Sequence, residues 1–166
     1  PKGNPIEWGG TIAYVNGDGN RLNYQNGGYY TICLNGKKAN INEETPSANA
    51  GKMVITLDKA LAAGDTIAYT AFINKDATGK KASPYIIFEN GTTAEGEVFS
   101  DEANIDAVCN GVPTLKYTIV PAEAAGSKTI TLTRSQTGTN LFITKLQVIE
   151  KTELELALNV ERYTGM

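Results

Sequence analysis

The sequence predicts an all-β protein: an antiparallel two-sheet β-sandwich, jelly-roll-like, with about eight to ten strands. One observation is a series of short runs rich in Ile, Val, Thr and aromatic residues, which are separated by Gly, Asn or Pro. The other is the near absence of helical periodicity. Many short strands with no helices between them favour antiparallel pairing and two packed sheets.

The predicted strands follow one another along most of the chain. Besides the strand that precedes the turn at 35–36, they are the runs at 10–15, 52–58, 65–73, 84–89, 114–120, 128–133 and 139–150. Between the second and third of these, the segment DKALAAG at 58–64 predicts one turn of helix that ends at Gly64.

The dipeptide Asn-Gly supplies the turns. It occurs five times, at 16–17, 26–27, 35–36, 90–91 and 110–111. Both residues tolerate the positive φ that type I′ hairpin turns need, so Asn-Gly between apolar runs indicates a hairpin. Before the turn at 35–36, Ile32 and Leu34 alternate with Thr31 and Cys33. This phase predicts that Tyr30 faces the core and Tyr29 faces outward.

The chain length of 166 residues fits one domain, which we assign to 1–150. In the remaining segment, 151–166, apolar residues alternate with polar or small ones, which predicts either an extra strand or the start of a further module. The first residue is Pro1 and not Met, so we expect a piece of a longer protein whose targeting segment has been removed.

Composition excludes several classes of function. The chain has no histidine, which removes Ser-His-Asp and Cys-His catalysis and the commonest zinc ligand. The net charge of −3, with no clustered basic face, argues against nucleic acid. No apolar run approaches the ~20 residues of a membrane-spanning helix, so we expect no membrane insertion. Cys33 and Cys109 are either buried thiols or a disulfide, and the sequence leaves both open.

Two segments carry a resemblance to a known family. LDKALAAGDTIAYTAF at 57–72 is similar to a strand pair of bacterial surface sandwiches, and SKTITLTRSQTGTNLFITKLQVIE at 127–150 resembles their closing hairpin. The pattern resembles non-catalytic jelly-roll modules appended to bacterial polysaccharide-degrading enzymes and surface glycan-binding proteins. The resemblance covers about residues 28–150. It implies carbohydrate binding and a location outside the cell or on its surface, but assigns no ligand residue.

The stretch NGDGNRLNYQNGGYY at 16–30 is the first candidate carbohydrate-binding site. Its four Gly and four Asn provide turns and polar atoms but little apolar area, so we expect an exposed loop system at one end of the sandwich. Tyr24 is the expected stacking ring, with Arg21, Asn23 and Gln25 as hydrogen-bond partners. The alternative is a wide turn that is only structural.

Four further residues are candidates for the same site. Trp8 lies between polar residues and glycines and is either a stacking platform or a core residue, whereas Tyr29 is expected to face outward. Tyr85 follows Ser83-Pro84 at a strand entrance, where an exposed ring is expected. Arg134 lies at a predicted turn and would donate to sugar hydroxyls, with a solvated loop arginine as the alternative.

No cofactor and no metal are predicted. Asp18-Gly19-Asn20 offers oxygen ligands for a structural Ca²⁺, but it lacks the alternating acids of an EF-hand loop. A glycosidase needs two acids about 5 to 9 Å apart, and Glu89 and Glu97, which flank the turn at 90–91, are the best candidate pair. We nevertheless expect no enzymatic activity.

These observations favour a non-catalytic carbohydrate-binding module of a larger secreted or cell-surface protein. Its partners would be a polysaccharide and neighbouring domains of the same chain. The alternative is a structural or adhesive spacer that binds protein or positions a neighbouring domain. Burial of the Tyr and Trp side chains, with no aromatic ring exposed on a concave sheet or loop rim, would favour the spacer.

Overall fold

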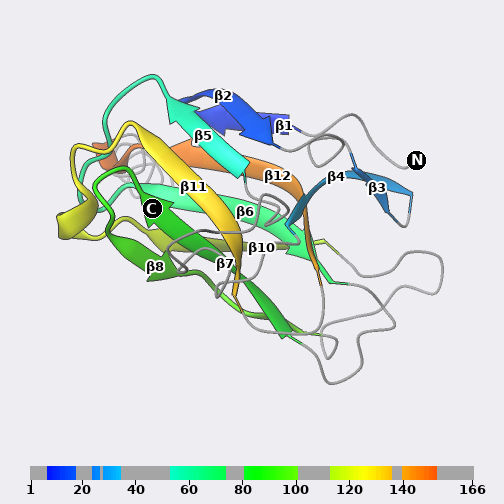
Figure 1. The fold of residues 1–166 in the computed structure, drawn as a ribbon. Helices are drawn as coiled ribbons and strands as arrows, with labels where there is room; N and C mark the ends of the chain where they lie inside the picture. Colours follow the sequence, from blue (N-terminus) through cyan, green and yellow to red (C-terminus); the bar gives the residue numbers. More distant parts are fainter. Residues whose placement is uncertain are drawn as a thin grey trace, which may run out of the picture.

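The computed structural model describes residues 7–17, 24–26, 28–34, 53–73, 81–100, 113–135 and 140–152. In these residues the strands form two six-stranded sheets that pack face to face (Figure 1). The prediction of an all-β two-sheet sandwich is therefore confirmed.

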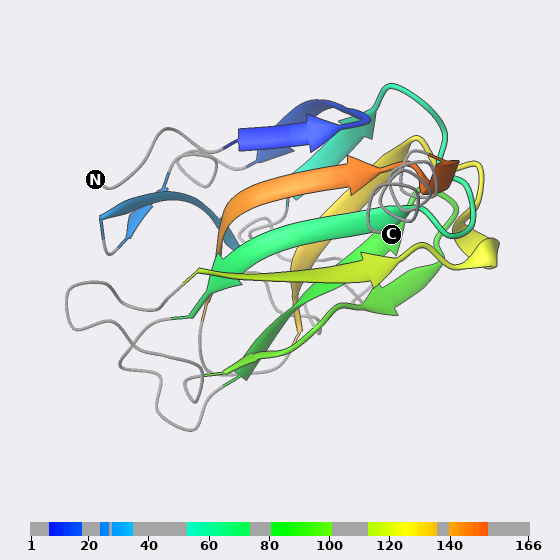
Figure 2. The same ribbon diagram turned by 180° about the vertical axis from the view of Figure 1, so that it is seen from behind.

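The first sheet has the order β10-β6-β12-β4-β3, and β1 also pairs with β12. Its strands are β10 (Thr114–Ile119), β6 (Thr66–Phe72), β12 (Leu141–Ile149), β4 (Tyr29–Leu34), β3 (Tyr24–Asn26) and β1 (Glu7–Gly10). All of its described pairs are antiparallel except β1 with β12, which is parallel. In Figure 2, β12, β6 and β10 lie side by side with the outer face of this sheet toward the viewer.

The second sheet has the order β2-β5-β11-β7-β8, and β9 also pairs with β7. Its strands are β2 (Ile12–Gly17), β5 (Met53–Leu57), β11 (Thr129–Ser135), β7 (Lys81–Phe88), β8 (Thr93–Glu95) and β9 (Phe99–Ser100). The strand number exceeds the predicted one because β1, β3, β8 and β9 are too short to recognise as periodic runs.

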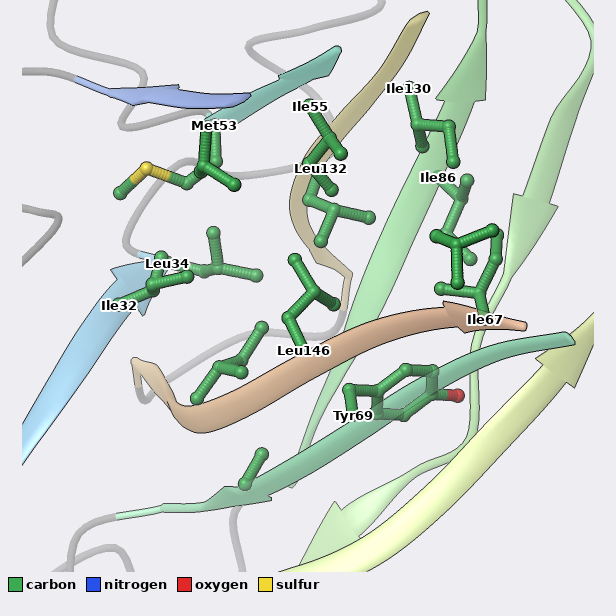
Figure 3. Packing of buried hydrophobic residues seen from close by; sticks show 14 of the residues in the cluster. Ile32, Leu34, Met53, Ile55, Ile67, Tyr69, Ile86, Ile130, Leu132 and Leu146 are labelled. Atoms are coloured by element: carbon green, nitrogen blue, oxygen red, sulfur yellow. The ribbon is translucent and has the colours of Figure 1, made fainter. Parts of the chain in front are cut away.

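The main core fills the space between the two sheets. Met53, Ile55 and Leu132 from the second sheet face Ile32 and Leu146 from the first (Figure 3). Alternate residues of each strand point inward, so their neighbours point to the two outer faces of the sandwich. The sandwich therefore offers two sheet faces on which a site can be built.

The segment 58–64 is not helical, so the predicted helical turn is wrong. Its backbone groups bond to other segments instead: Leu61 N–H donates to Ser127 O at 2.8 Å, and Gly126 N–H donates to Leu61 O at 2.8 Å. The Asp65 carboxylate accepts the N–H groups of Ala62 and Lys151 at 2.9 and 3.0 Å. Burial of Leu61 against the core, together with these bonds, is more favourable than one isolated turn of helix.

Glycine is required where the chain passes from β1 to β2. Gly10 has φ +73°, and an added Cβ would lie 1.7 Å from Val148 O. Thr11 N–H donates to the same carbonyl at 2.9 Å, which holds the crossing close to β12. This crossing sends β1 to one sheet and β2 to the other.

The turn predicted at 90–91 joins β7 to β8 as a hairpin, with Gly91 at φ +90°. The turn predicted at 35–36, the one at 110–111 and the segment 153–166 lie outside the described residues. In the described part of the chain, no helix is long and apolar enough to cross a membrane.

Candidate functional site

Strand β10 turns its apolar residues toward solvent. Leu115, Tyr117 and Ile119 are 65%, 59% and 51% exposed, whereas the alternating residues on the other side of the strand are half-buried. A strand at the edge of a sandwich ordinarily places its apolar row against the core. The reversed orientation leaves a row of large apolar side chains in water.

Specific polar contacts hold the inward row of β10. The hydroxyl groups of Thr118 and Tyr69 are 2.8 Å apart and hydrogen-bonded, and the Tyr69 oxygen also accepts the Glu97 N–H at 2.8 Å. Lys116 Nζ donates to Val98 O at 2.6 Å and lies 5.0 Å from the centroid of the Phe99 ring. Burial raises the pKa of Tyr69 above its ordinary value of 10.0, so the phenol keeps its proton. These contacts compensate the inward polar groups and fix the orientation of the strand.

The exposed row belongs to a larger surface on the outer face of the first sheet, which we call the Tyr117 face. It consists of the outward side chains of β10, β6 and β12: Leu115, Tyr117, Ile119, Thr66, Ala68, Thr70, Lys145, Gln147 and Ile149. Register places Tyr117, Ala68 and Gln147 in one line across the three strands. Small side chains of β6 thus run between two rows of larger ones, about 10 Å apart.

A β-bulge in β12 gives this face its polar row. The register with β6 shifts between Ile143 and Lys145, so Ile143 and Leu146 both reach the core. Without the extra residue, the alternation would send Lys145 and Gln147 inward. Thr144 at the bulge donates from its hydroxyl to Thr70 O at 3.3 Å.

One end of the Tyr117 face carries a cluster of rings from Phe72, Phe142, Tyr24 and Tyr29, which we call the ring cluster. Phe72 and Phe142 are stacked with centroids 5.4 Å apart. Tyr24 stacks on Phe142, and Tyr29 lies against Phe72, each at 5.8 Å between centroids. The Tyr24 and Tyr29 rings of the β3–β4 hairpin therefore lie against Phe142 and Phe72 of the neighbouring strands, and both phenylalanines are buried.

The predicted exposed loop at 16–30 is wrong in its described parts. Asn16 and Gly17 end β2, residues 24–26 form β3, and Thr31 donates from its hydroxyl to Tyr24 O at 2.7 Å. Tyr24 is half-buried, and Gln25 points to the opposite side of β3, so the two do not share a site. Arg21 and Asn23 lie outside the described residues.

The β4 alternation places Tyr30 on the same side as Ile32 and Leu34, as predicted, and Tyr29 on the other. Tyr29 is not a freely exposed ring, however, because it is half-buried in the ring cluster. Cys33 is a buried thiol beside the same rings, and Cys109 lies outside the described residues.

Tyr85 and Arg134 are not exposed as expected. Tyr85 is only 6% exposed and Arg134 only 4% exposed. Both belong to the paired strands β7 and β11, where Arg134 lies opposite Pro84. The pairing of β7 with β11 thus extends beyond the predicted start of β7 and the predicted end of β11, so both residues lie within strands. Burial lowers the pKa of the Arg134 guanidinium from its ordinary value.

Trp8 is neither fully exposed nor a core residue. It lies on β1 in register with the core residue Leu146 and is 40% exposed. The Trp8 ring therefore borders the core at the β1 side of the sheet and does not belong to the Tyr117 face.

The candidate catalytic pair is separated by the hairpin. Gly96 N–H donates to Pro84 O at 2.7 Å, which places Glu97 beside the beginning of β7. Glu89 follows the end of β7, about 16 Å away along the strand, and its carboxylate accepts the Lys128 N–H at 2.6 Å. The two acids are too far apart to act as a glycosidase pair.

Metal binding has no candidate in the described part of the chain, which contains no group of three His, Cys, Asp or Glu residues placed to hold an ion. Residues 18–20, which offer oxygen ligands in the sequence but were not predicted to bind a metal, lie outside it.

The sequence contained one signal for the Tyr117 face that the prediction of a strand at 114–120 did not use. In TLKYTIV the apolar residues alternate with Thr and Lys, and either row could face inward. Only the polar partners of Lys116 and Thr118 decide between the two orientations. Those partners come from Val98 and Tyr69, which are distant in the sequence.

The sequence matches no protein-family model and no curated protein sequence. The fold is similar to solved structures of carbohydrate-binding modules. One is a mutant of the family 29 module CBM29-2, with TM-score 0.43, 13% identity and coverage of 84% of this chain and 93% of that one. The xylan-binding module CBM15 has TM-score 0.44 and 8% identity, with coverage of 80% of this chain and 88% of that one. A pectin-binding module has TM-score 0.43 and 16% identity, with coverage of 84% of this chain and 91% of that one. At these scores the similarity carries no argument about the ligand, which rests on the geometry of the faces.

Proposed function

We propose that this chain is a non-catalytic carbohydrate-binding module of a larger secreted or cell-surface protein, and that it binds polysaccharide on the Tyr117 face. One observation carries the proposal: β10 exposes Leu115, Tyr117 and Ile119 while polar side chains of the same strand are held inward. Exposing an apolar row that could have been buried is unfavourable in the isolated domain. Such a patch is typical of a binding surface.

The residues around Tyr117 suit a sugar ring. The C–H face of a pyranose would stack on the Tyr117 ring, which is directly accessible from solvent. The small side chain of Ala68 leaves room beside the ring, and Gln147 lies in line beyond it with an amide that can donate and accept. Lys145 and Thr70 offer further partners for hydroxyl groups.

The shape of the face suits one extended chain. Thr66, Ala68 and Thr70 form a row along β6 about 13 Å long, flanked on both sides by longer side chains. A linear glycan lying along this row would contact β10 on one side and β12 on the other. Residues Arg21 and Asn23 remain candidates for additional hydroxyl contacts.

Several features support the non-catalytic part of the proposal. The chain has no histidine, and the register separates Glu89 from Glu97. Export and attachment to neighbouring domains rest on the resemblance of 57–72 and 127–150 to surface modules. Incubation with soluble polysaccharides should release no reducing ends above background.

Affinity gel electrophoresis tests the binding proposal. Xylan, mixed-linkage β-glucan, galactomannan and pectin are incorporated into native gels, and we expect at least one to retard the protein. Tyr117→Ala should weaken that binding about fivefold, since one aromatic contact contributes about 1 kcal/mol. Tyr117→Phe is the matched control, because it keeps the ring and should retain binding within about twofold. Wild-type protein that migrates unretarded in every gel would falsify the proposal.

The alternative of a structural or adhesive spacer makes a different prediction for the same surface. The apolar row of β10 would then contact protein, and Tyr117→Ala would change the association of the domain with its neighbours while all glycans fail to bind. Burial of all tyrosine and tryptophan rings would have favoured the spacer, and the exposure of Tyr14 and Tyr117 is contrary to that expectation.

A further inference from the structure

The outer face of the second sheet carries no charge across its three adjacent strands β2, β5 and β11. We call this surface the Tyr14 face; its described outward residues from the central part of these strands are Tyr14, Asn16, Val54, Thr56, Thr129 and Thr131. Register aligns Tyr14 with Thr56 and Thr129, and Asn16 with Val54 and Thr131. Among the described residues, the charged Asp58 and Lys128 lie at the ends of these strands.

The position of Tyr14 is defined by a second irregularity in the ladder. The register of β2 against β5 shifts between Ile12 and Tyr14, so that Ile12 and Val15 both reach the core. Tyr14 is consequently directed outward and is 57% exposed, almost the same exposure as Tyr117 on the opposite side of the sandwich.

We propose that the Tyr14 face is a second carbohydrate-binding site, for an uncharged polysaccharide, and that the domain is bivalent. This inference rests on the proposed function, because it assigns the same class of ligand to another face. It commits to an uncharged ligand because the face offers a ring, hydroxyls and methyl groups but no ionic partner. Threonine hydroxyls both donate and accept, as do those of a sugar.

The arrangement of the face matches a flat ligand surface. Tyr14 stands on the edge strand β2 and would stack on one sugar ring. Thr56 and Thr129 follow on the next two strands at intervals of about 4.8 Å, within the breadth of a chain lying across the strands. Because the two faces point in opposite directions, the domain would hold two chains at once.

Four proteins test the proposal: wild type, Tyr14→Ala, Tyr117→Ala and the double variant. Affinity electrophoresis in xylan, mixed-linkage β-glucan, galactomannan and pectin measures binding, and turbidity on mixing with the same soluble polysaccharides measures cross-linking. We expect each single variant to bind one uncharged polysaccharide about fivefold more weakly at the altered face and to cross-link it less than wild type does. The double variant should show the least retardation and the least cross-linking.

A charge placed on the face gives an independent readout. Thr131→Lys should weaken binding to the uncharged polysaccharide as much as Tyr14→Ala does, because it would bury an ammonium group under the ligand. Ala63→Lys, in the exposed segment before β6, is the matched control and should leave binding unchanged. Thermal unfolding of each variant checks that the fold is intact.

The outcomes separate the two proposals. If Tyr117→Ala alone abolishes binding, and Tyr14→Ala and Thr131→Lys match wild type, the second site is overturned and the proposed function stands. If Tyr14→Ala alone abolishes binding, bivalency is overturned and the Tyr117 face is not the site. If no polysaccharide retards the wild type, both proposals fail together.

Discussion

The two outer faces of the sandwich each present one exposed tyrosine on an edge strand, Tyr117 on β10 and Tyr14 on β2. The surroundings differ. On the Tyr117 face, large apolar residues, small residues and longer polar residues form three successive rows. On the Tyr14 face, threonine and valine give side chains of similar length, and no charge interrupts them.

The two tyrosines are also exposed for different structural reasons. In β2, the shift of register between Ile12 and Tyr14 places Val15 in the core and Tyr14 outside. In β10 the orientation of the whole strand is reversed: the hydroxyl of Thr118 faces inward and bonds to Tyr69, whereas the ammonium group of Lys116 bonds to Val98 O in an exposed contact. In β2, Ile12 and Val15 still fill the core, so one outward tyrosine costs the fold little. Reversing a whole strand requires matched polar contacts, which is why the Tyr117 face is the stronger case for binding.

Phe142→Ala should have the largest effect, because it removes a buried ring on which one end of the Tyr117 face depends. Phe142 is 2% exposed and stacks on both Phe72 and Tyr24. We expect a loss of about 3 to 5 kcal/mol in the free energy of unfolding, measured by urea titration. Ile119→Ala on the same face is the control, and should cost less than about 0.5 kcal/mol. A loss below about 1 kcal/mol for Phe142→Ala would contradict the ring cluster.

Tyr24→Ala should have an intermediate effect that distinguishes it from the exposed tyrosines. The half-buried Tyr24 ring stacks on Phe142, so its removal should destabilise the domain by about 1 to 2 kcal/mol. The exposed loop predicted at 16–30 would instead leave the stability of this variant nearly unchanged. Tyr117→Ala and Tyr14→Ala, compared in the same thermal melts, should stay within about 0.5 kcal/mol of wild type. Equal melting temperatures for all three variants would place Tyr24 in solvent.

The burial of Tyr69 should also give the stability a dependence on alkaline pH. Folding raises the pKa of Tyr69 above 10.0, so above that pH the unfolded chain releases a proton that the folded chain keeps. Stability contributed by this group is therefore present below pH 10 and falls as pH rises through the folded pKa. Tyr69→Phe should lose about 1 kcal/mol near neutral pH but should fall less steeply above pH 10.

Urea titrations of wild type and Tyr69→Phe at several pH values between 8 and about 11 measure this difference. Parallel stability curves for the two proteins would mean that Tyr69 is not held in its protonated form by the fold.

The strands of this protein could be predicted from the sequence because their signal is local. The runs at 52–58, 65–73 and 114–120 correspond to β5, β6 and β10 within two residues at each end. The short strand β3 was mistaken for a loop because three residues rich in polar atoms show no period. Its existence depends on Thr31, whose hydroxyl bonds the Tyr24 carbonyl, and on the rings beneath the hairpin.

The candidate site was less predictable. Stacking rings were expected at Trp8, Tyr24, Tyr29 and Tyr85, but the structure leaves Tyr24 and Tyr29 half-buried and Tyr85 buried. The sequence does not single out Tyr117 or Tyr14, since both lie within runs that predict regular strands. Exposure of a strand residue depends on which face the strand presents, and a shift of one residue reverses that face.

The sequence by itself determined that this chain would form a sandwich of short strands, because β-branched runs and glycine turns act within a few residues of one another. It also excluded histidine chemistry outright. The tertiary structure alone decided which side of each strand meets solvent. The bulges at 143–145 and 12–14 change which residues of β12 and β2 face the core. Tyr69 and Val98, which are distant in sequence, bond to Thr118 and Lys116 and so fix the reversed orientation of β10. Hydrogen bonds between residues far apart in sequence have no local pattern, so only the folded chain reveals the faces that they create.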